Sequence, residues 1–336
     1  MGIDRAGSLL SLVEQIGREA FRRNNSANMT SASAPGKIIL FGEHAVVYGR
    51  PALAVPVTQV HVDVEISDND SAGIWLSAPD VDLHAELNML PSDHPIASVI
   101  HNLFFLSRVS PFPNLNVKIS STIPVASGLG SGAAVTVALT RALSEHINYA
   151  MTDEQVSAFA YEIEKLHHGT PSGIDNTVVT YAKPVYFVKG QPIETFKVRQ
   201  PFTIVVADTG ISAPTKESVG DVRKLWETDK AKWENMFDEV ADISFSARHV
   251  IREGWIKMLG ALMDENHAYL QEMTVSSPEL DNLVSVARKA GALGAKMSGG
   301  GRGGNMIALV EEETAPVIAE ALMSAGAKRI ITTQVS

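Results

Sequence analysis

The sequence has no cysteine, no surplus of basic residues and no long basic run. Without cysteine, a disulfide framework, a thiolate metal site and a cysteine nucleophile are excluded. The 336 residues carry 28 Lys and Arg against 38 Asp and Glu, a formal net charge of −10. Because nucleic-acid binding requires clustered Lys and Arg, this balance argues against a nucleic-acid partner. An anionic ligand would have to be held by backbone amides, a helix terminus, one or two cations or a metal ion.

The sequence also shows no pattern typical of a targeting signal or a membrane-spanning segment. Charged residues at positions 4, 5, 14, 18 and 19 interrupt the first apolar residues, so a signal peptide is not expected. Residues 119–140 carry no charge, and a bilayer crossing takes about 20 residues. Pro124 and several Gly and Ser residues favour a strand, a glycine loop and a buried helix there instead. We expect no membrane partner and a cytoplasmic location.

Composition and hydrophobic pattern predict an α+β protein. With 45% hydrophobic and 20% charged residues the chain is globular, and its length suits two domains. Strands are expected at residues 60–66, 115–119, 186–188, 203–207 and 306–310, and helices at 9–20, 153–166, within 216–273 and from 278 to 290. We expect an N-terminal helical extension over 1–28 and domains over 29–197 and 198–336, with the boundary near 195–201.

Two of the expected helices have specific start signals. Thr152 and Gln155 have the spacing of a capping box, in which each side chain bonds the backbone N–H of the other. Ser277 precedes Pro278, a favoured pair for the cap and the first helical position. These signals predict helices that begin at residues 153 and 278.

A glycine-rich segment at residues 124–132, Pro-Val-Ala-Ser-Gly-Leu-Gly-Ser-Gly, suits phosphate binding. Glycine permits positive φ and close backbone approach, and a helix starting near Ser131 would present unpaired amides. Such a cradle needs no basic residue, so an acidic protein could hold a nucleotide with it. The segment has neither the Walker ending nor the Rossmann spacing. A tight structural turn is the alternative interpretation.

Two carboxylates flank a turn-rich segment that follows the predicted helix 153–166. Glu164 lies near the end of that helix, and Asp175 follows eleven residues later. Carboxylates so placed could reach one site, one as a ligand for Mg²⁺ and one as a base. A solvated surface glutamate is the alternative, because acids are common on helix surfaces.

A third segment, residues 34–49, combines a buried strand with polar residues. Lys37, Glu43 and His44 flank the apolar run Ile38–Phe41, so they should lie at its ends or face a cleft. A buried lysine needs a counter-charge, for which Asp175 is a candidate.

These three segments and residues 296–305 resemble, in order and spacing, the signature motifs of the GHMP kinase superfamily. The resemblance covers residues 30–336. Glu-His-Ala-Val-Val-Tyr-Gly at 43–49 and His-Gly-Thr-Pro-Ser-Gly-Ile-Asp at 168–175 look like the mevalonate kinase branch. A galactokinase would be expected to have Glu-His-Thr-Asp-Tyr, whereas Val46 and Val47 stand here. This apolar patch suits a small branched acid better than a sugar.

The resemblance implies a two-domain GHMP kinase fold, with an N-terminal domain like ribosomal protein S5 domain 2 and a ferredoxin-like C-terminal domain. It implies ATP- and Mg²⁺-dependent phosphorylation of the 5-hydroxyl of mevalonate by a homodimer. Phosphomevalonate kinase, a kinase for another hydroxyl and a family decarboxylase stay open as enzyme alternatives. A non-catalytic sensor that keeps the nucleotide cleft is the alternative from another class.

The resemblance also implies roles for individual residues. Asp175 would be the catalytic base, and Lys37 would lie beside the acceptor hydroxyl and pair with it. Substrate would be bound by Glu43, His44, Thr215 and Gly300, the ATP phosphates by Pro124, Ser127, Gly128, Leu129, Gly130, Ser131 and Gly132, and Mg²⁺ by Glu164 and Ser131. Phosphoryl transfer depends mainly on positioning and charge neutralisation, which agrees with this set.

Two positions depart from the family pattern. Gly132 stands where the family usually has a second loop serine that supplies a hydroxyl to Mg²⁺. Arg302 interrupts the glycine run 299–304, where the family usually has glycine. Its side chain would either point to solvent or add a fixed cation near phosphate.

Overall fold

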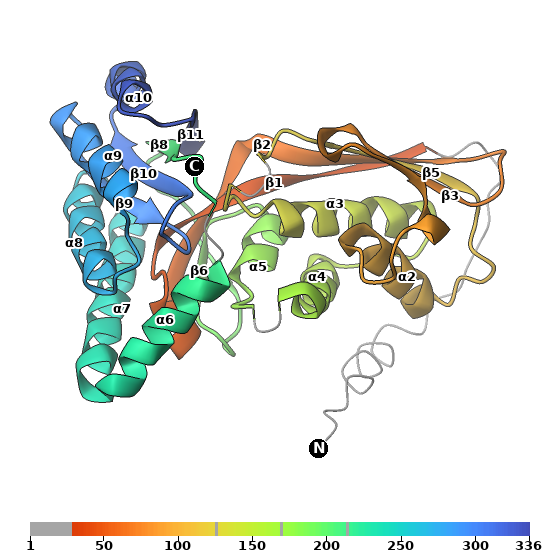
Figure 1. The fold of residues 1–336 in the computed structure, drawn as a ribbon, viewed down its shortest axis with the longest axis horizontal. Helices are drawn as coiled ribbons and strands as arrows, with labels where there is room; N and C mark the ends of the chain where they lie inside the picture. Colours follow the sequence, from red (N-terminus) through yellow and green to blue (C-terminus); the bar gives the residue numbers. More distant parts are fainter. Residues whose placement is uncertain (1–28, 125–126, 169–170, 213–214) are drawn as a thin grey trace. The chain divides into compact units, whose positions relative to one another are not determined.

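The computed structural model describes residues 29–124, 127–168, 171–212 and 215–336 (Figure 1). The predicted helix at 9–20 and the extension 1–28 lie outside these residues. The chain forms two compact units. Of the described residues, the first includes 29–34, Val62–Thr122 and Gly132–Pro171, and the second Pro35–His61, Ile123–Ser131 and Ser172–Ser336. The expected domains 29–197 and 198–336 are continuous stretches of sequence, whereas each unit combines several stretches. The division at 197/198 stays a prediction.

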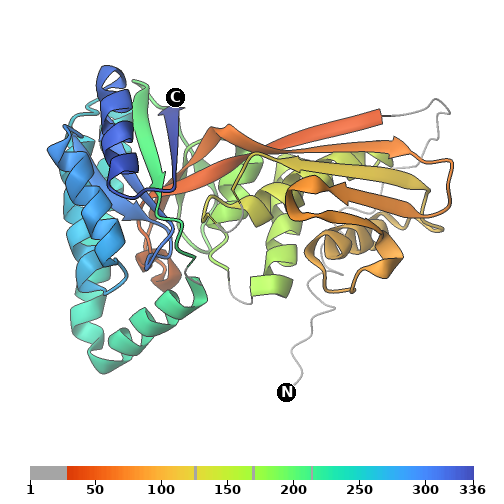
Figure 2. The same cartoon turned by 45° about the horizontal axis from the view of Figure 1, so that its top comes forward.

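The first unit is a sheet covered by helices on one face (Figures 1 and 2). Residues 62–68 of β2 (Ala52–Asp68) pair antiparallel with β5 (Leu115–Ser121), which is parallel to β3 (Ile74–Ala78), and β3 pairs with β4 (Leu83–Glu86). The helices are α2 (Pro95–Ser107), α3 (Ser131–His146) and α4 (Asp153–His168). Val117 and Ile119 of β5 are buried while Asn116 and Lys118 are exposed, so one sheet face packs under the helices and the other meets solvent.

The second unit contains a four-stranded antiparallel sheet in the order β11-β8-β10-β9. Its strands are β8 (Phe202–Asp208), β9 (Gly294–Ser298), β10 (Asn305–Val310) and β11 (Arg329–Val335). The helices α7 (Lys230–Glu253), α8 (Met258–Glu272), α9 (Pro278–Lys289) and α10 (Ala315–Ser324) lie along one side of it (Figures 1 and 2). Val205, Phe237, Met306 and Ile318 belong to the core shared by the sheet and these helices.

Shorter elements complete the second unit and carry several site residues. They are the end of β1 (Met29–Phe41), the turn η1 (Ala45–Tyr48), the start of β2, α5 (Ile174–Tyr181), β6 (Val185–Phe187), β7 (Glu194–Thr195) and α6 (Thr215–Thr228). Strand β1 pairs with β2, whose first residues pair with β6. The remaining turns are η2 (Pro79–Val81), η3 (Leu87–Met89) and η4 (Glu312–Thr314).

The predicted strands and the predicted helices within the described residues are confirmed. The capping box is present, because the Thr152 N–H donates to Gln155 Oε1 at 2.8 Å and the Gln155 N–H donates to Thr152 Oγ1 at 3.3 Å. The Leu280 N–H likewise donates to Ser277 Oγ at 3.3 Å. Strand β2 starts at Ala52, earlier than expected, because its first residues are an apolar run without alternation.

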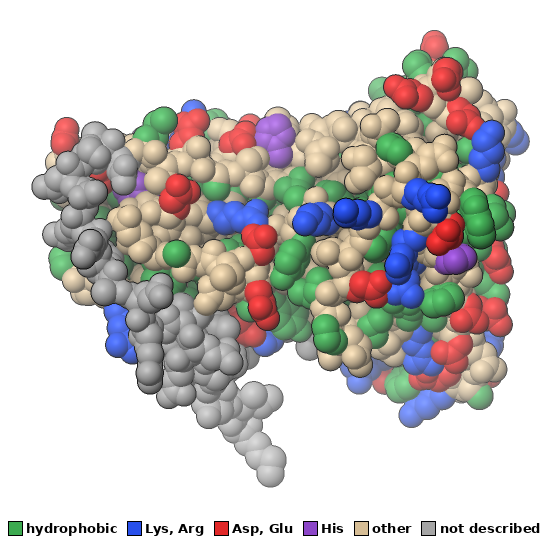
Figure 3. Space-filling model, turned by 180° about the vertical axis from the view of Figure 1, so that it is seen from behind, with side chains coloured by type: hydrophobic (Ala, Val, Ile, Leu, Met, Phe, Trp, Pro, Cys, Tyr) green, Lys and Arg blue, Asp and Glu red, His purple; other side chains and the backbone are tan. Residues whose placement is uncertain are grey.

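The uncharged residues 119–140 include the end of β5 and much of α3. Within the described part of the chain, no helix is both long and apolar enough to cross a bilayer. On the molecular face in Figure 3, acidic side chains lie among the basic ones.

Candidate active site

The site is built around a buried lysine within strand β1. Strand β1 runs through an apolar segment to Phe41, and the side chain of Lys37 is only 6% exposed. Its Nζ lies 3.0 Å from Oδ1 of Asp175, so the predicted pair is confirmed. Asp175 lies in the first turn of α5, where the helix dipole favours a negative charge. Its side chain is 28% exposed, so a substrate can reach the carboxylate.

The first glycine segment passes directly over Lys37. The Lys37 N–H donates to the Leu129 carbonyl at 2.9 Å, which fixes the segment to β1. Gly130 has φ +76°, and a Cβ there would lie 2.8 Å from Lys37 Cγ. Only glycine fits this approach without displacing the lysine. Helix α3 begins at Ser131, so its unpaired amides follow the glycines as the sequence predicts.

The second glycine segment, residues 299–304, is tied to the first by Asn305. The Asn305 side-chain amide donates to the Ser127 carbonyl, and the asparagine is 2% exposed. Gly304 is held by Thr209, whose N–H and hydroxyl both donate to its carbonyl at 2.9 and 3.0 Å. Sequence reasoning included Asn305 only as the last residue of a motif and gave it no role. A polar residue directly before the predicted apolar strand 306–310 was the available signal.

His44 contacts the second glycine segment and is neutral. Its Nε2 lies 3.1 Å from the Gly300 carbonyl oxygen. Because a carbonyl only accepts, Nε2 carries the hydrogen and Nδ1 has a free lone pair. Nδ1 is buried and has no hydrogen-bond partner among the described residues. Burial lowers the pKa of His44 to about 4, against the hydrogen bond to Gly300. His44 also has φ 61°, an uncommon conformation for a residue other than glycine.

Gly300 also brings Thr215 to the same place. Thr215 is the first residue of α6. A Cβ on Gly300 would lie 2.8 Å from Thr215 Oγ1 and 3.0 Å from its Cγ2. The absence of a side chain at Gly300 is therefore what allows this contact. Three of the residues predicted to bind the acceptor, His44, Gly300 and Thr215, are thus neighbours.

Glu43 lies behind this group rather than on its surface. Its carboxylate pairs with Lys296 of β9, and both side chains are 0% exposed. Burial raises the pKa of Glu43 and lowers the pKa of Lys296, and the attraction between the two opposes both shifts. Lys296 Nζ also donates to the Met297 carbonyl at 2.7 Å. Sequence reasoning included Lys296 only as the first residue of a motif. A lysine within an apolar strand was the signal for a buried partner.

The residues predicted to bind a metal lie on different helices. Glu164 lies on α4 in the first unit, and Ser131 opens α3. Among the described residues, no group of three or more His, Asp or Glu side chains is arranged to hold a metal. The chemistry of the donors nevertheless fits, because carboxylate and hydroxyl oxygens suit Mg²⁺, which keeps several water ligands. A Cβ on Gly132 would meet no atom within 4 Å, so nothing there replaces the missing serine.

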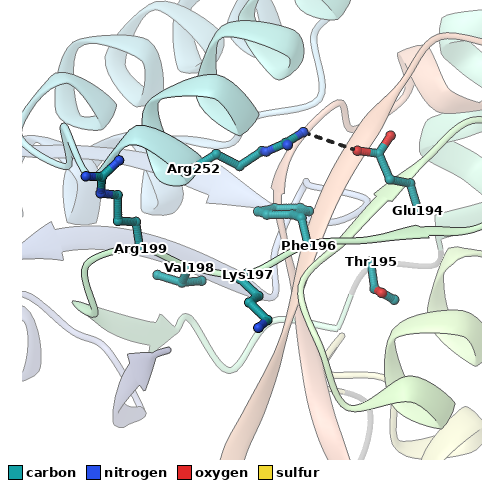
Figure 4. A pocket seen from close by; sticks show the side chains of 7 residues that line it. All are labelled: Glu194, Thr195, Phe196, Lys197, Val198, Arg199 and Arg252. Atoms are coloured by element: carbon teal, nitrogen blue, oxygen red, sulfur yellow. Dashed lines mark ion pairs between the residues drawn. The ribbon is translucent and has the colours of Figure 1, made fainter.

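A separate hollow of about 520 Å³ lies in the second unit (Figure 4). It is lined by Glu194, Thr195, Phe196, Lys197, Val198, Arg199 and Arg252. Glu194 accepts a hydrogen bond from Arg248 at 2.7 Å and lies 3.8 Å from Arg252. Two arginines therefore pair with the one carboxylate that lines this hollow. None of the sequence-predicted site residues lines this hollow.

Comparisons with known proteins show the family to which the chain belongs. The family model described as the GHMP kinases N terminal domain matches residues 96–183, and the GHMP kinases C terminal model matches 247–328. A mevalonate kinase of Thermococcus sibiricus is 36% identical over 318 residues, which cover 90% of this chain and 95% of that protein. This chain belongs to the GHMP kinase family. It is an enzyme, a kinase, and ATP is the phosphoryl donor that the family uses.

Solved structures of GHMP kinases confirm the expected two-domain α+β fold. The structure of L. major mevalonate kinase in complex with R-mevalonate has a TM-score of 0.83 and 29% identity, covering 94% of this chain and 99% of that one. The mevalonate kinase of Methanococcus jannaschii has a TM-score of 0.80 and 26% identity, covering 94% of this chain and 100% of that one. The GHMP kinase fold therefore extends over nearly the whole chain.

Proposed function

We propose that this GHMP kinase transfers the γ-phosphoryl group of ATP to the 5-hydroxyl of mevalonate, giving 5-phosphomevalonate and ADP. The observation that carries the proposal is the pair between buried Lys37 and accessible Asp175 under Gly130. The choice of mevalonate as acceptor rests on the similarity of this chain to mevalonate kinases.

Asp175 acts as the base in this proposal, and Lys37 supports it. The ammonium group stabilises negative charge that develops on the acceptor oxygen. Asp175 takes the hydroxyl proton, the oxygen forms a bond to the γ-phosphorus, and the bond from that phosphorus to ADP breaks. The fixed Lys37–Asp175 distance supplies the positioning on which phosphoryl transfer depends.

The acceptor is held by His44, Gly300 and Thr215. The hydrogen bond to Gly300 fixes the tautomer and the position of the His44 ring. Glu43 contributes indirectly, because its pair with Lys296 fixes the residue next to His44. Val46 and Val47 provide no carboxylate for sugar hydroxyls.

The phosphates of ATP are bound by backbone amides of residues 127–132 and the first turn of α3. Glu164 and Ser131 would supply carboxylate and hydroxyl oxygens to Mg²⁺, which would neutralise charge on the phosphates. Because Gly132 stands where the family usually has a serine, this chain has one hydroxyl fewer for Mg²⁺ than the family usually has. We further propose a homodimer in the cytoplasm, as the family resemblance implies.

Release of ADP tests this function directly. The purified chain is assayed with ATP and Mg²⁺ and with mevalonate, phosphomevalonate, galactose or homoserine in parallel, and the product is identified by phosphorus NMR. We expect stimulation by mevalonate and a phosphomonoester on its 5-oxygen. Stimulation by phosphomevalonate alone would make the chain a phosphomevalonate kinase, and nucleotide binding without turnover on any acceptor would favour a sensor.

A further inference from the structure

The side chain of Arg302, the charged residue within the second glycine segment, is bonded to other protein groups rather than pointing into open solvent. Its Nη1 donates to Oδ2 of Asp221 at 2.5 Å, and its Nε donates to the Thr274 carbonyl at 3.4 Å. Its backbone N–H donates to the Val275 carbonyl at 2.7 Å. Its φ of 60° is left-handed, as at the neighbouring glycines. The side chain therefore joins the glycine segment to two other elements.

Asp221 is a charged partner on α6. Its carboxylate accepts hydrogen bonds from Lys224 at 2.7 Å and from Arg302. These bonds, with that from Lys224 the larger cause, hold the pKa of Asp221 below its usual value. The Asp221 and Arg302 side chains are 35% and 33% exposed, so solvent only partly screens their attraction. The ion pair is present at neutral pH.

The same helix meets the same glycine segment at a second point. Thr215 opens α6 and contacts Gly300, while Asp221 lies about 9 Å further along the helix. Gly300 in turn bonds His44. The position of α6 therefore sets where Thr215 lies relative to His44.

We propose that Arg302 is a positioning residue for the acceptor: its ion pair with Asp221 holds α6, and thereby Thr215, against Gly300 and His44. It does not itself bind phosphate. The planar guanidinium suits this role, since it reaches a carboxylate and a backbone carbonyl in fixed directions. The inference rests on the proposed function, in which His44, Gly300 and Thr215 hold mevalonate.

The other end of the glycine segment offers an internal comparison. Asn305 bonds the first glycine segment through Ser127, and so supports the nucleotide side of the site. Loss of the Arg302–Asp221 ion pair should weaken binding of the acceptor, whereas loss of the Asn305 contact should weaken binding of ATP. The two effects are separable in steady-state kinetics.

The test uses Arg302→Gly, Asp221→Ala, the double variant and the charge exchange Arg302→Asp with Asp221→Arg. Arg302→Gly removes the side chain but suits the left-handed backbone. We expect KM for mevalonate to rise about tenfold in both single variants, with kcat and KM for ATP within about threefold of wild type. The double variant should be no worse than either single variant, and the charge exchange should recover part of the loss.

Lys224→Ala is the matched control, because it removes an exposed partner of the same carboxylate, and it should leave KM unchanged. If Arg302→Gly raises KM for ATP while Asp221→Ala does not, Arg302 is a phosphate ligand and the inference fails. Equal kinetics in all variants and wild type would also overturn it.

Hydrogen exchange of residues 216–224 in the intact, substrate-free chain separates this inference from the proposed function. Exchange should quicken in Arg302→Gly and Asp221→Ala, but not in Lys224→Ala beyond its own residue. Unchanged exchange in the first two variants contradicts the positioning role whatever the acceptor is. Quickened exchange in a chain that mevalonate does not stimulate would refute the proposed function alone.

Discussion

Lys37 Nζ lies 3.0 Å from Asp175 Oδ1, and the two side chains differ in exposure, 6% for the lysine and 28% for the aspartate. The ammonium group is thus enclosed by protein while the carboxylate remains open on one side. A base needs this combination, because its partner charge is fixed and its free oxygen can reach a substrate. The geometry of the pair therefore suits Asp175, and not Lys37, to take a proton from a bound hydroxyl.

Asp175→Asn should abolish turnover while ATP still binds. The amide keeps the shape of the carboxylate but cannot take the hydroxyl proton, so kcat should fall at least about 100-fold. Lys37→Met should also lower kcat, because it leaves the carboxylate without its counter-charge. Turnover is measured as ADP release, and nucleotide binding by calorimetry. Near-wild-type kcat in Asp175→Asn would refute the base assignment. Lys118→Met, which removes a surface ion pair with Glu65, is the control.

Removing one partner of the Glu43–Lys296 pair should destabilise the fold more than removing both charges. Lys296→Met leaves a buried, unpaired carboxylate, which should lower the free energy of unfolding by about 3–5 kcal/mol. Adding Glu43→Gln removes that charge, so the double variant should be more stable than Lys296→Met alone. Urea denaturation of both variants checks this order. A double variant that is less stable than Lys296→Met would contradict the account of a costly unpaired charge.

Acid should destabilise the fold through two buried histidines. Burial lowers the pKa of His44 and of His267 to about 4, and His267 also accepts from the Met297 N–H and lies 3.1 Å from Asp281. Between pH 6.5 and 4 the unfolded chain binds protons at these positions that the folded chain does not. The free energy of unfolding should therefore fall as pH falls through this range, by on the order of 3 kcal/mol for each histidine at most.

Unfolding measured in urea at several pH values checks this sign. His44→Gln should flatten the slope between pH 6.5 and 4 relative to wild type. A slope that is the same in His44→Gln and wild type would show that His44 takes up its proton normally in the folded state.

The sequence predicted most elements because their signals are local. Period-2 alternation identified β5, and the Thr152–Gln155 capping box identified the start of α4. The partners of Glu43 and Arg302 were not predictable in this way. Lys296 is 253 residues from Glu43 and Asp221 is 81 from Arg302, so only the folded topology brings them together. Lys37 and Asp175 were paired correctly because a buried charge demands a partner and the resemblance to the GHMP kinases pointed to Asp175.

Replacement by alanine should lower kcat at Gly130 but have little effect at Gly132. Gly130 has φ +76° and a Cβ there would lie 2.8 Å from Lys37 Cγ, so Gly130→Ala should strain the backbone and displace the lysine. We expect kcat to fall by about tenfold or more, since small displacements at a phosphoryl-transfer site are costly. Gly132 lies in α3 with open space where a methyl group would be added, so Gly132→Ala should keep the fold and most activity. Equal loss of kcat in the two variants would show that close approach to Lys37 is not what requires glycine.

Gly132→Ser then tests whether the missing hydroxyl matters. The position has space for it, since a Cβ there meets nothing within 4 Å. If the hydroxyl joins the Mg²⁺ ligands, the concentration of Mg²⁺ that gives half-maximal ADP release should fall in Gly132→Ser and stay unchanged in Gly132→Ala. An identical Mg²⁺ dependence in the two variants would mean that the side chain at 132 does not reach the metal.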